Sequence, residues 1–329
     1  MPFTPTRRRI IQAGALGIVA APLSGLAPAH ALTPETSVRR ATHGITLMFI
    51  FYFREPAVDH ASPISPPAGA ADDPVERIDG SLAAGVLFLC DHATNALPKA
   101  YGTLGLAREQ LDRHIAYDVG AAWITRRLAR GFGAPAILSR FSRLLIDPNR
   151  GADDPTLVMR LSDGDIIPGN ARIGAEEIEY RHAHYWKPYR AAIAAMIDSM
   201  LSQGPPPAVV SIHTFTPAWK ARPRPWEVAI LWDSDPRFAK PLIAALTGEG
   251  LCVGDNEPYD GALMGDTLDE EVTRRGLAGL LIETRQDLVG TTARAIAFAD
   301  RLARLLRPIL ARPELHCKAF FPSRTGRHV

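Results

Sequence analysis

The segment VLFLCDHATN, Val86–Asn95, is an apolar run of strand length that stops abruptly at an acid and a histidine. In an α/β protein, ligands are held at the carboxyl ends of buried strands, because side chains there leave the sheet on short, well-supported loops. Asp91 and His92 are therefore a candidate metal-binding or catalytic pair. The ordinary alternative is a strand end that polar residues only cap.

Two later segments repeat this pattern. Val209–Thr214, VVSIHT, places His213 after a second apolar run, and Gly279–Arg285, GLLIETR, places Glu283 after a third. Strands that end in His, His and Glu can converge on one site, with both imidazoles on a metal ion and the carboxylate acting on its water. The pattern therefore favours a metal-hydrolase type of site.

Strand-like apolar runs alternate with helical patterns from about residue 75 onward, which indicates an α/β layered fold. Hydrophobic residues make up 47% of the chain, enough to bury a substantial core. The expected helices are Leu106–Phe132, Glu176–Leu201 with a break near Pro188, Arg237–Leu246 and Thr291–Leu310. The further expected strands are Pro135–Leu138, Leu144–Ile146, Glu227–Trp232 and Leu251–Val253.

The amino terminus resembles a twin-arginine export signal. Arginines at positions 7–9 precede a short, weakly apolar run, and an A-x-A cleavage site ends at Ala31. We therefore divide the chain into a signal (1–31), a linker (32–74), the main domain (75–311) and a loose tail (312–329), and expect a periplasmic protein. The alternative is a start codon placed too far upstream, in which case we expect a cytoplasmic protein.

Composition and absent motifs argue against several classes of function. The net charge of +2 gives no reason to expect nucleic acid as a partner, and the short apolar runs do not predict stable membrane insertion. The three cysteines form no CxxC pair, so neither a disulfide framework nor a thiolate zinc site follows. The sequence has no GxSxG, GxxxxGK(S/T), HExxH or well-placed GxGxxG motif, which disfavours serine esterases, nucleotide hydrolases and dinucleotide enzymes. It does not indicate an oligomeric state.

The metal that these residue types favour is zinc. His92 and His213 offer neutral nitrogen ligands, and a catalytic zinc takes three protein ligands and keeps one position open for water. Asp91, Asn95 and Asp118 are the candidates for the third ligand. The two carboxylates are better zinc donors than the neutral amide, but the spacing leaves the choice open.

Glu283 is the candidate catalytic acid and base. A carboxylate beside the metal can take a proton from the attacking water and deliver it later to the leaving amine. The alternative role for Glu283 is an ion pair with Arg285, which follows it by two residues.

Asn149 and Arg150 are candidate substrate-binding residues, since they place an amide beside a guanidinium just after an apolar run. Arginine binds a carboxylate through two parallel hydrogen bonds, so this pair is suited to clamp an acidic substrate. Arg140 and Arg143 lie close by in the sequence, and we count Arg143 and Arg285 as further candidates. The alternative is a surface turn that an arginine caps.

Six motifs, in order along the chain, resemble those of the N-formylglutamate amidohydrolase family. They are Cys90–Pro98, Ser142–Arg150, Tyr185–Tyr189, Ile212–Pro217, Asp255–Tyr259 and Ile282–Leu288. The resemblance covers roughly residues 75–310. It implies a zinc-exopeptidase-like, three-layer α/β fold with a mixed, mostly parallel central sheet, and metal-dependent amide hydrolysis.

The resemblance also implies roles for single residues. It places His92 and His213 at zinc-ligand positions and Glu283 at the position of the catalytic carboxylate. Asn149 and Arg150 fall at the clamp for the substrate carboxylate. We therefore expect zinc-dependent cleavage of a small N-acyl acidic amino acid, first of all N-formyl-L-glutamate. The alternatives are hydrolysis of another N-acyl amino acid or short peptide fragment, and a non-catalytic carboxylate-binding homologue.

Two departures from the resemblance bear on the site. The wider superfamily has Glu three residues after the first His, where this chain has Asn95. Family members usually carry a His in the segment that matches Thr267–Glu271, TLDEE, which has acids and no His here. If that His assists catalysis, we expect this protein to have weak activity or altered specificity.

Overall fold

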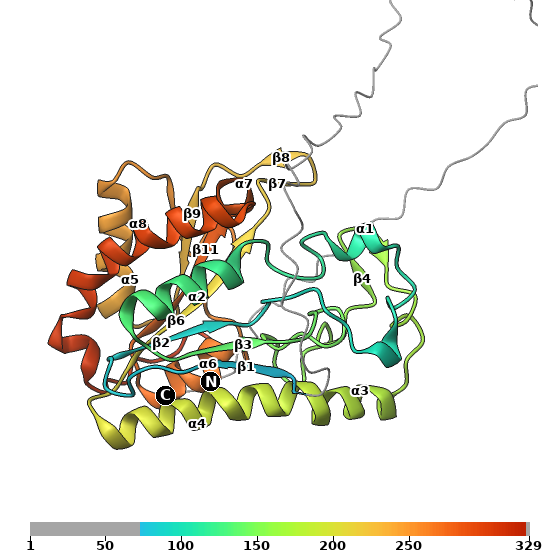
Figure 1. The fold of residues 1–329 in the computed structure, drawn as a ribbon, viewed down its shortest axis with the longest axis horizontal. Coiled ribbons are helices and arrows are strands. Elements are labelled where there is room, and N and C mark those ends of the chain that lie inside the picture. The colour runs from blue at the N-terminus through green and yellow to red at the C-terminus, as the bar shows by residue number, and fades with distance from the viewer. Residues whose placement is uncertain (1–72, 327–329) are drawn as a thin grey trace, which may run out of the picture. The chain divides into compact units, whose positions relative to one another are not determined.

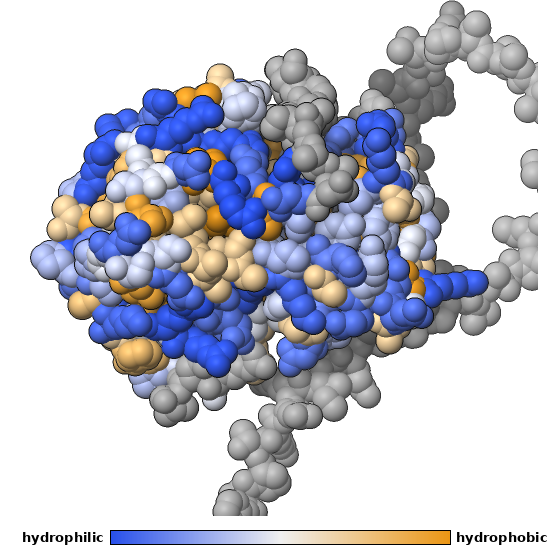
Figure 2. Space-filling view, turned by 60° about the horizontal axis from the view of Figure 1, so that its bottom comes forward, coloured by the Kyte–Doolittle hydropathy of each residue, from blue (hydrophilic) through white to orange (hydrophobic). Residues whose placement is uncertain are grey.

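The computed structural model of this protein describes residues 73–326 (Figure 1). The predicted export signal and all but the last two residues of the predicted linker lie outside the described residues. Among residues 73–326, no helix combines the length and the apolar character that crossing a bilayer requires. On the face shown in Figure 2, hydrophilic residues surround small groups of apolar residues.

The centre of the fold is a seven-stranded sheet with the order β1-β3-β2-β6-β11-β9-β10. Its four middle strands from β3 to β11 run parallel, β1 is antiparallel to β3, and β9 is antiparallel to β11 and parallel to β10. The strands are β1 Val75–Ile78, β2 Val86–Cys90, β3 Ala136–Ser139, β6 Ala208–Phe215, β9 Val228–Leu231, β10 Val253–Asp255 and β11 Gly279–Arg285. Two small hairpins accompany it, β4 Leu161–Ser162 with β5 Asp165–Ile166, and β7 Ala218–Trp219 with β8 Arg222–Pro223. The predicted mixed, mostly parallel sheet is confirmed.

Helices cover both faces of the sheet, so the fold has the three predicted layers (Figure 1). The α-helices are α1 Arg108–Leu111, α2 Ala121–Phe132, α3 Ala175–Arg181, α4 Lys187–Gln203, α5 Pro236–Gly248, α6 Thr267–Glu271, α7 Gln286–Val289 and α8 Thr292–Leu310. The shorter helical turns are η1 Lys99–Tyr101, η2 His182–Trp186, η3 Thr273–Arg275 and η4 Pro313–His316.

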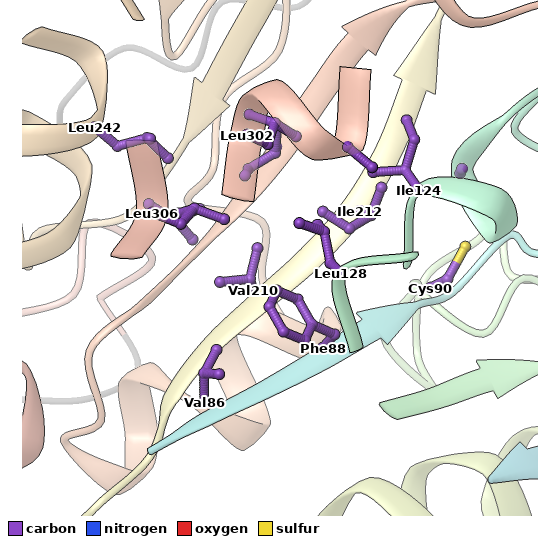
Figure 3. Packing of buried hydrophobic residues seen from close by; sticks show 14 of the residues in the cluster. Val86, Phe88, Cys90, Ile124, Leu128, Val210, Ile212, Leu242, Leu302 and Leu306 are labelled. Carbon is purple, nitrogen blue, oxygen red and sulfur yellow. The ribbon is translucent and has the colours of Figure 1, made fainter. Parts of the chain in front are cut away.

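The alternation of side chains along β2 shows how the two layers form. Val86 and Phe88 point to the face that α2, α5 and α8 cover, and Figure 3 shows side chains of these helices gathered over β2 and β6. Leu87 and Leu89 point to the opposite face, where α4 packs. Phe88 is fully buried, and replacing such a ring by alanine typically costs about 3–5 kcal/mol.

The predicted helix Leu106–Phe132 is wrong in its middle, because only α1 and α2 are helical. Gly120 lies between them with a φ of 86°, and a Cβ there would lie 2.5 Å from the carbonyl oxygen of Val289. The backbone therefore turns before α2 begins. This turn brings Asp118 to the end of β2, where its N–H donates to the carbonyl of His92 at 2.9 Å.

The predicted strand Leu144–Ile146 is also wrong, since these residues form a turn in which the Leu145 N–H donates to the Ser142 carbonyl at 2.9 Å. All three side chains are buried. The apolar run therefore indicated burial and not strand pairing. An apolar run of this length does not distinguish between the two.

The predicted helix Glu176–Leu201 is continuous through α3, the π-helical turn η2 and α4. Within it, the Lys187 N–H donates to the carbonyl of His182, five residues earlier. Pro188, in the first turn of α4, has no N–H to donate to the preceding turn. The expected break near Pro188 thus takes the form of a π turn.

Residues 312–326, which we expected to form part of a loose tail, pack against the rest of the domain. Leu315 of η4 is fully buried. The Arg324 N–H donates to Asp233 at 2.8 Å, and its guanidinium pairs with Asp260 at 2.7 Å. The tail prediction is therefore wrong for these residues, because polar anchors that lie far away in the sequence hold them.

Candidate functional site

The three strand-end side chains converge at one edge of the sheet. His92 follows β2 by two residues, whereas His213 and Glu283 lie within β6 and β11 near the carboxyl ends of these strands. The parallel register pairs His213 directly with Glu283. The ring centroids of His92 and His213 are 5.0 Å apart. The predicted convergence of two imidazoles and one acid is thus present in the fold.

Asp118 stands between the two imidazoles. Its Oδ2 lies 3.0 Å from Nδ1 of His213 and 3.5 Å from Nδ1 of His92. One ligand atom from each of these three buried residues lies within 4.8 Å of the other two. Of the three candidates for the third ligand, the structure therefore favours Asp118.

A second carboxylate holds the other nitrogen of each imidazole. His92 Nε2 lies 2.7 Å from Asp147, and His213 Nε2 lies 3.0 Å from Asp91. Metal-binding histidines usually pair their far nitrogen in this way, which orients the ring and leaves the near nitrogen for the ion. In addition, Nδ1 of His92 is buried and makes no hydrogen bond to the described residues. Two imidazole nitrogens and one carboxylate oxygen, oriented in this way, fit a zinc ion.

Asp91 and Asn95 have other roles than the predicted one of third ligand. Asp91 accepts hydrogen bonds from the hydroxyls of Ser211 at 2.6 Å, Thr267 at 2.8 Å and Tyr189 at 3.1 Å, in addition to its contact with His213. The Asn95 amide instead donates to the carbonyl of Leu111 at 3.0 Å and to Asp112 at 3.1 Å. Asp91 therefore orients a candidate ligand, and Asn95 lies outside the metal-binding set.

Charge is strongly coupled within this cluster. Burial by itself would raise the pKa of Asp118, but the charges and hydrogen bonds of His92 and His213 outweigh burial and hold it well below its usual range. Burial likewise opposes the charged form of His213, yet its hydrogen bonds to Asp118 and Asp91 raise its pKa well above the ordinary value. A metal ion must therefore displace a proton from this imidazole in order to bind.

Glu283 differs from Asp91, Asp118 and Asp147, the buried acids that contact the two imidazoles. Burial raises its pKa to about 7, although the positive charge of His213 opposes the shift. Its Oε2 is buried and makes no hydrogen bond to residues 73–326. The alternative ion pair with Arg285 is absent, because the Arg285 guanidinium pairs with Asp287 and donates to backbone carbonyls, including that of Trp226. Glu283 is thus a free carboxyl group next to the candidate metal ligands.

A cavity of about 410 Å³ opens onto these groups. His92, Asp118, His213 and Glu283 line it, together with the predicted clamp residues Arg143, Asn149 and Arg150.

The clamp residues differ in how firmly the protein holds them. The Arg143 guanidinium pairs with Asp147 at 2.7 Å, and the side-chain amide oxygen Oδ1 of Asn149 accepts the Thr267 backbone N–H at 3.1 Å. Among residues 73–326, the Arg150 guanidinium makes only a longer contact of 3.8 Å with Asp147, so of the two clamp arginines it is the less tightly held and the better placed to bind a substrate carboxylate.

Arg285, predicted as a substrate-binding residue, does not line this cavity. Its side chain leaves the end of β11 toward residues 224–226 and Asp287. Arg140, which lies close to Asn149 and Arg150 in the sequence, does not line the cavity either. The sequence placed these arginines near the motifs, but side-chain direction decided which of them reach the cavity.

The segment Thr267–Glu271 supports residues of the site through hydrogen bonds. Thr267 donates its N–H to Asn149 and its hydroxyl to Asp91, and it also receives a hydrogen bond from Arg190 at 3.1 Å. The segment adds no side chain to the lining of the cavity. This segment, which lacks the His that the resembling family usually carries, thus acts on the site through hydrogen bonds and not as part of the cavity lining.

Sequence reasoning missed several residues of the site. Asp147, which contacts His92, lies inside the motif that supplied the clamp, and Tyr259, which lines the cavity, lies inside another of the six motifs, so both carried a signal. Gln286 also lines the cavity and lies inside the last of the six motifs, whereas His114 and Trp219 line the cavity but lie outside all six.

A buried His–Asp–His set lies beside a free acid at the carboxyl ends of strands in a mixed sheet, within a three-layer α/β fold. This arrangement places the protein in the class of hydrolases with a candidate metal centre. The chain belongs to the N-formylglutamate amidohydrolase family, whose model matches residues 84–289, and it is thus a hydrolase that acts on amide bonds. The predicted family and the predicted class of enzyme are confirmed.

Several solved structures resemble this chain, and two of them illustrate the likeness in identity and fold. A gene product of Agrobacterium tumefaciens is 33% identical with a TM-score of 0.69, and the match covers 74% of this chain and 97% of that protein. An N-formylglutamate amidohydrolase from Ralstonia eutropha JMP134 is 19% identical with a TM-score of 0.53, over 72% of this chain and 99% of that protein. The second likeness concerns the fold alone. Among proteins of curated function, no sequence matches this chain.

Proposed function

We propose that this protein is a zinc-dependent amidohydrolase that cleaves a small N-acyl acidic amino acid, first of all N-formyl-L-glutamate to formate and L-glutamate. The observation that carries this proposal is the meeting of His92, Asp118, His213 and Glu283 in one cavity that also contains two arginines. The matching family model supports the choice of substrate.

His92, Asp118 and His213 would hold the zinc ion, which supplies Lewis-acid activation of water and of the amide carbonyl. Glu283 takes one proton from the attacking water, because its free oxygen lies at the cavity and its pKa is raised to about 7. Glu283 then returns the proton to the amide nitrogen as the C–N bond breaks. The products are one carboxylic acid and one amine, so water is consumed and no other reactant is needed.

Arg150, Asn149 and Arg143 position the substrate. The free guanidinium of Arg150 binds a substrate carboxylate through two hydrogen bonds, and the Asn149 side-chain N–H groups add further donors. Arg143 is held by Asp147 and supplies positive charge to the same wall of the cavity. A substrate fixed in this way presents its amide to Glu283 in a reactive orientation.

Substitution of the acid tests the proposal. Glu283→Gln preserves the size of the side chain and should lower kcat for formate release by about 10²–10⁴-fold, because removal of a general base has this range of effects. Zinc content, measured by elemental analysis, should stay at the wild-type level. Glu314→Gln, at an exposed ion pair, is the matched control and should keep full activity.

Two results would contradict the proposal. Unchanged turnover in Glu283→Gln would remove the proposed base. Wild-type protein that holds zinc and binds N-formyl-L-glutamate without releasing formate would instead point to the non-catalytic homologue.

We also propose export to the periplasm through the twin-arginine signal of residues 1–31. The sequence pattern at the amino terminus supports this proposal. Mass determination of the amino terminus of protein isolated from cells tests it. A mature chain that starts after Ala31 is expected, and an unprocessed chain that is found in the cytoplasm would contradict it.

A further inference from the structure

The cavity has an aromatic wall that the proposed cleavage of a formyl group does not use. Phe215, Trp219 and Tyr259 line it, and Leu231 and Leu281 continue the apolar surface. Trp219 is 42% exposed and Tyr259 is 43% exposed, so both rings offer uncovered surface. An apolar ligand group that covers this surface gains binding energy.

Arg224 holds the three rings of this wall together. Its guanidinium carbon lies 5.6 Å, 5.7 Å and 5.1 Å from the ring centres of Phe215, Trp219 and Tyr259, respectively. One guanidinium nitrogen donates to the Tyr259 hydroxyl at 2.8 Å, and the other donates to the carbonyl of Thr216 at 3.2 Å. Arg224 is itself buried and does not line the cavity, so the wall presents rings and not a cation.

The order of the strands puts the candidate metal ligands between the arginine clamp and the aromatic wall. The clamp residues follow β3, and the metal candidates His92 and His213 belong to β2 and β6. The aromatic residues come from the end of β6, from the β7–β8 hairpin and from the loop after β10, which lies at the opposite edge of the sheet. A substrate whose carboxylate meets Arg150 and whose amide meets Glu283 therefore extends its acyl group toward the rings.

The size of the cavity agrees with a larger acyl group. At about 410 Å³, the cavity falls in the range of about 300–1,000 Å³ that is typical of sites for drug-sized ligands. A formyl group has one carbon and no apolar substituent, so it leaves the aromatic wall uncovered.

We propose that the aromatic wall of Phe215, Trp219 and Tyr259 is an acyl-binding subsite, and that the preferred substrates are N-acyl acidic amino acids whose acyl group carries an apolar chain or ring. This proposal rests on the proposed cleavage of N-acyl acidic amino acids, and within that substrate class it places apolar acyl groups ahead of the formyl group named above. The reaction stays a hydrolysis, in which water adds to the acyl carbon, the C–N bond breaks and the proton returns to the amine.

A comparison of substrates tests the subsite. With the zinc-loaded enzyme, kcat/KM for N-phenylacetyl-L-glutamate should exceed kcat/KM for N-formyl-L-glutamate by about tenfold or more. Trp219→Ala should reduce this ratio at least severalfold. Phe320→Ala, which removes an exposed ring outside the cavity, is the control and should keep the ratio. A higher kcat/KM for the formyl substrate in the wild-type enzyme would overturn the subsite and leave the proposed amidohydrolase function intact.

A binding measurement keeps the two proposals separate. If neither substrate is turned over, the proposed function fails, and calorimetric titration of the same two compounds still tests the subsite. N-phenylacetyl-L-glutamate should then bind about tenfold more tightly than N-formyl-L-glutamate, and Trp219→Ala should remove the difference. Equal affinities of the wild-type protein for the two compounds would overturn the subsite.

Discussion

Asp91 and Glu283 are two buried acids on opposite sides of His213, and their surroundings differ completely. Asp91 receives hydrogen bonds from three hydroxyl groups and contacts the imidazole of His213. Burial would raise its pKa, but the hydrogen bond and the charge of His213, followed by the hydrogen bond from Ser211, hold the pKa below the ordinary range. Glu283 has an oxygen without a hydrogen bond, and burial raises its pKa to about 7.

This difference shows how carboxyl groups in one site can have two roles, one structural and one in proton transfer. A carboxylate whose acceptor sites are filled stays charged and fixes its neighbours, as Asp91 fixes His213. A carboxyl group with an unfilled acceptor exchanges protons near neutral pH, as a general base requires. Burial is common to both, so the outcome depends on what opposes it: Asp91 accepts hydrogen bonds from His213 and Ser211, whereas one oxygen of Glu283 accepts none from residues 73–326.

The largest effect should follow from removing the well-bonded acid. Asp91→Asn should weaken zinc binding by about 10–100-fold, because outer partners of metal-binding histidines typically contribute this much. It should also lower the free energy of unfolding by about 3–5 kcal/mol, as expected when one partner of a buried pair is removed. Zinc titration with a competing chelator and urea denaturation measure the two effects.

Glu283→Gln is the matched control for Asp91→Asn, since both variants replace a buried carboxyl group by an amide. In the metal-free protein, the charged form of Glu283 is unfavourable above its raised pKa of about 7. Glu283→Gln should therefore keep or increase the free energy of unfolding at pH 8. Equal losses of stability in the two variants would contradict the assignment of different roles.

Asp266 should show an intermediate effect, because burial raises its pKa to about 7 as well. An unfolded Asp releases its proton near pH 3.9, so between about pH 4 and pH 7 the folded state holds a proton that the unfolded state has lost. This group therefore lowers stability progressively as the pH rises through that range. Asp266→Asn should remove the loss, which is on the order of a few kcal/mol at pH 8.

The readout for Asp266 is the difference in unfolding free energy between variant and wild type across pH 4–8. Asn can replace Asp at the N-cap of α6, where Asp266 accepts the Asp269 N–H at 2.7 Å. The difference should grow with pH in favour of the variant. A difference that stays constant across this range would show that Asp266 titrates normally.

The smallest effect should come from the clamp. Arg150→Lys keeps the charge but removes the two-pronged hydrogen bonding, and should raise KM for an N-acyl-glutamate by about tenfold with little change in kcat. Arg285→Lys is the control, since Arg285 does not line the cavity. Steady-state kinetics of both variants decide the matter, and a larger rise of KM in Arg285→Lys would reverse the assignment.

Local patterns predicted much of the fold because they depend on local physics. The apolar runs that end at Cys90 and Glu283, and the amphipathic pattern of Thr291–Leu310, correspond to β2, β11 and α8. The patterns failed where a buried segment does not adopt the secondary structure that its apolar residues suggest. Leu144–Ile146 is buried without pairing as a strand, and Gly120 ends a periodic run because its backbone passes close to Val289.

The sequence by itself determined the α/β class, the family, and the placement of His92, His213 and Glu283 at the ends of buried strands. These features follow from the period of apolar residues and from short motifs, which neighbouring residues encode. Only the tertiary structure chose Asp118 over Asp91 and Asn95, gave Asp91 and Asp147 their roles behind the imidazoles, and turned Arg285 away from the cavity. The physical reason is that these choices depend on side-chain directions and on hydrogen bonds between residues 55 to 122 positions apart, which no local pattern encodes.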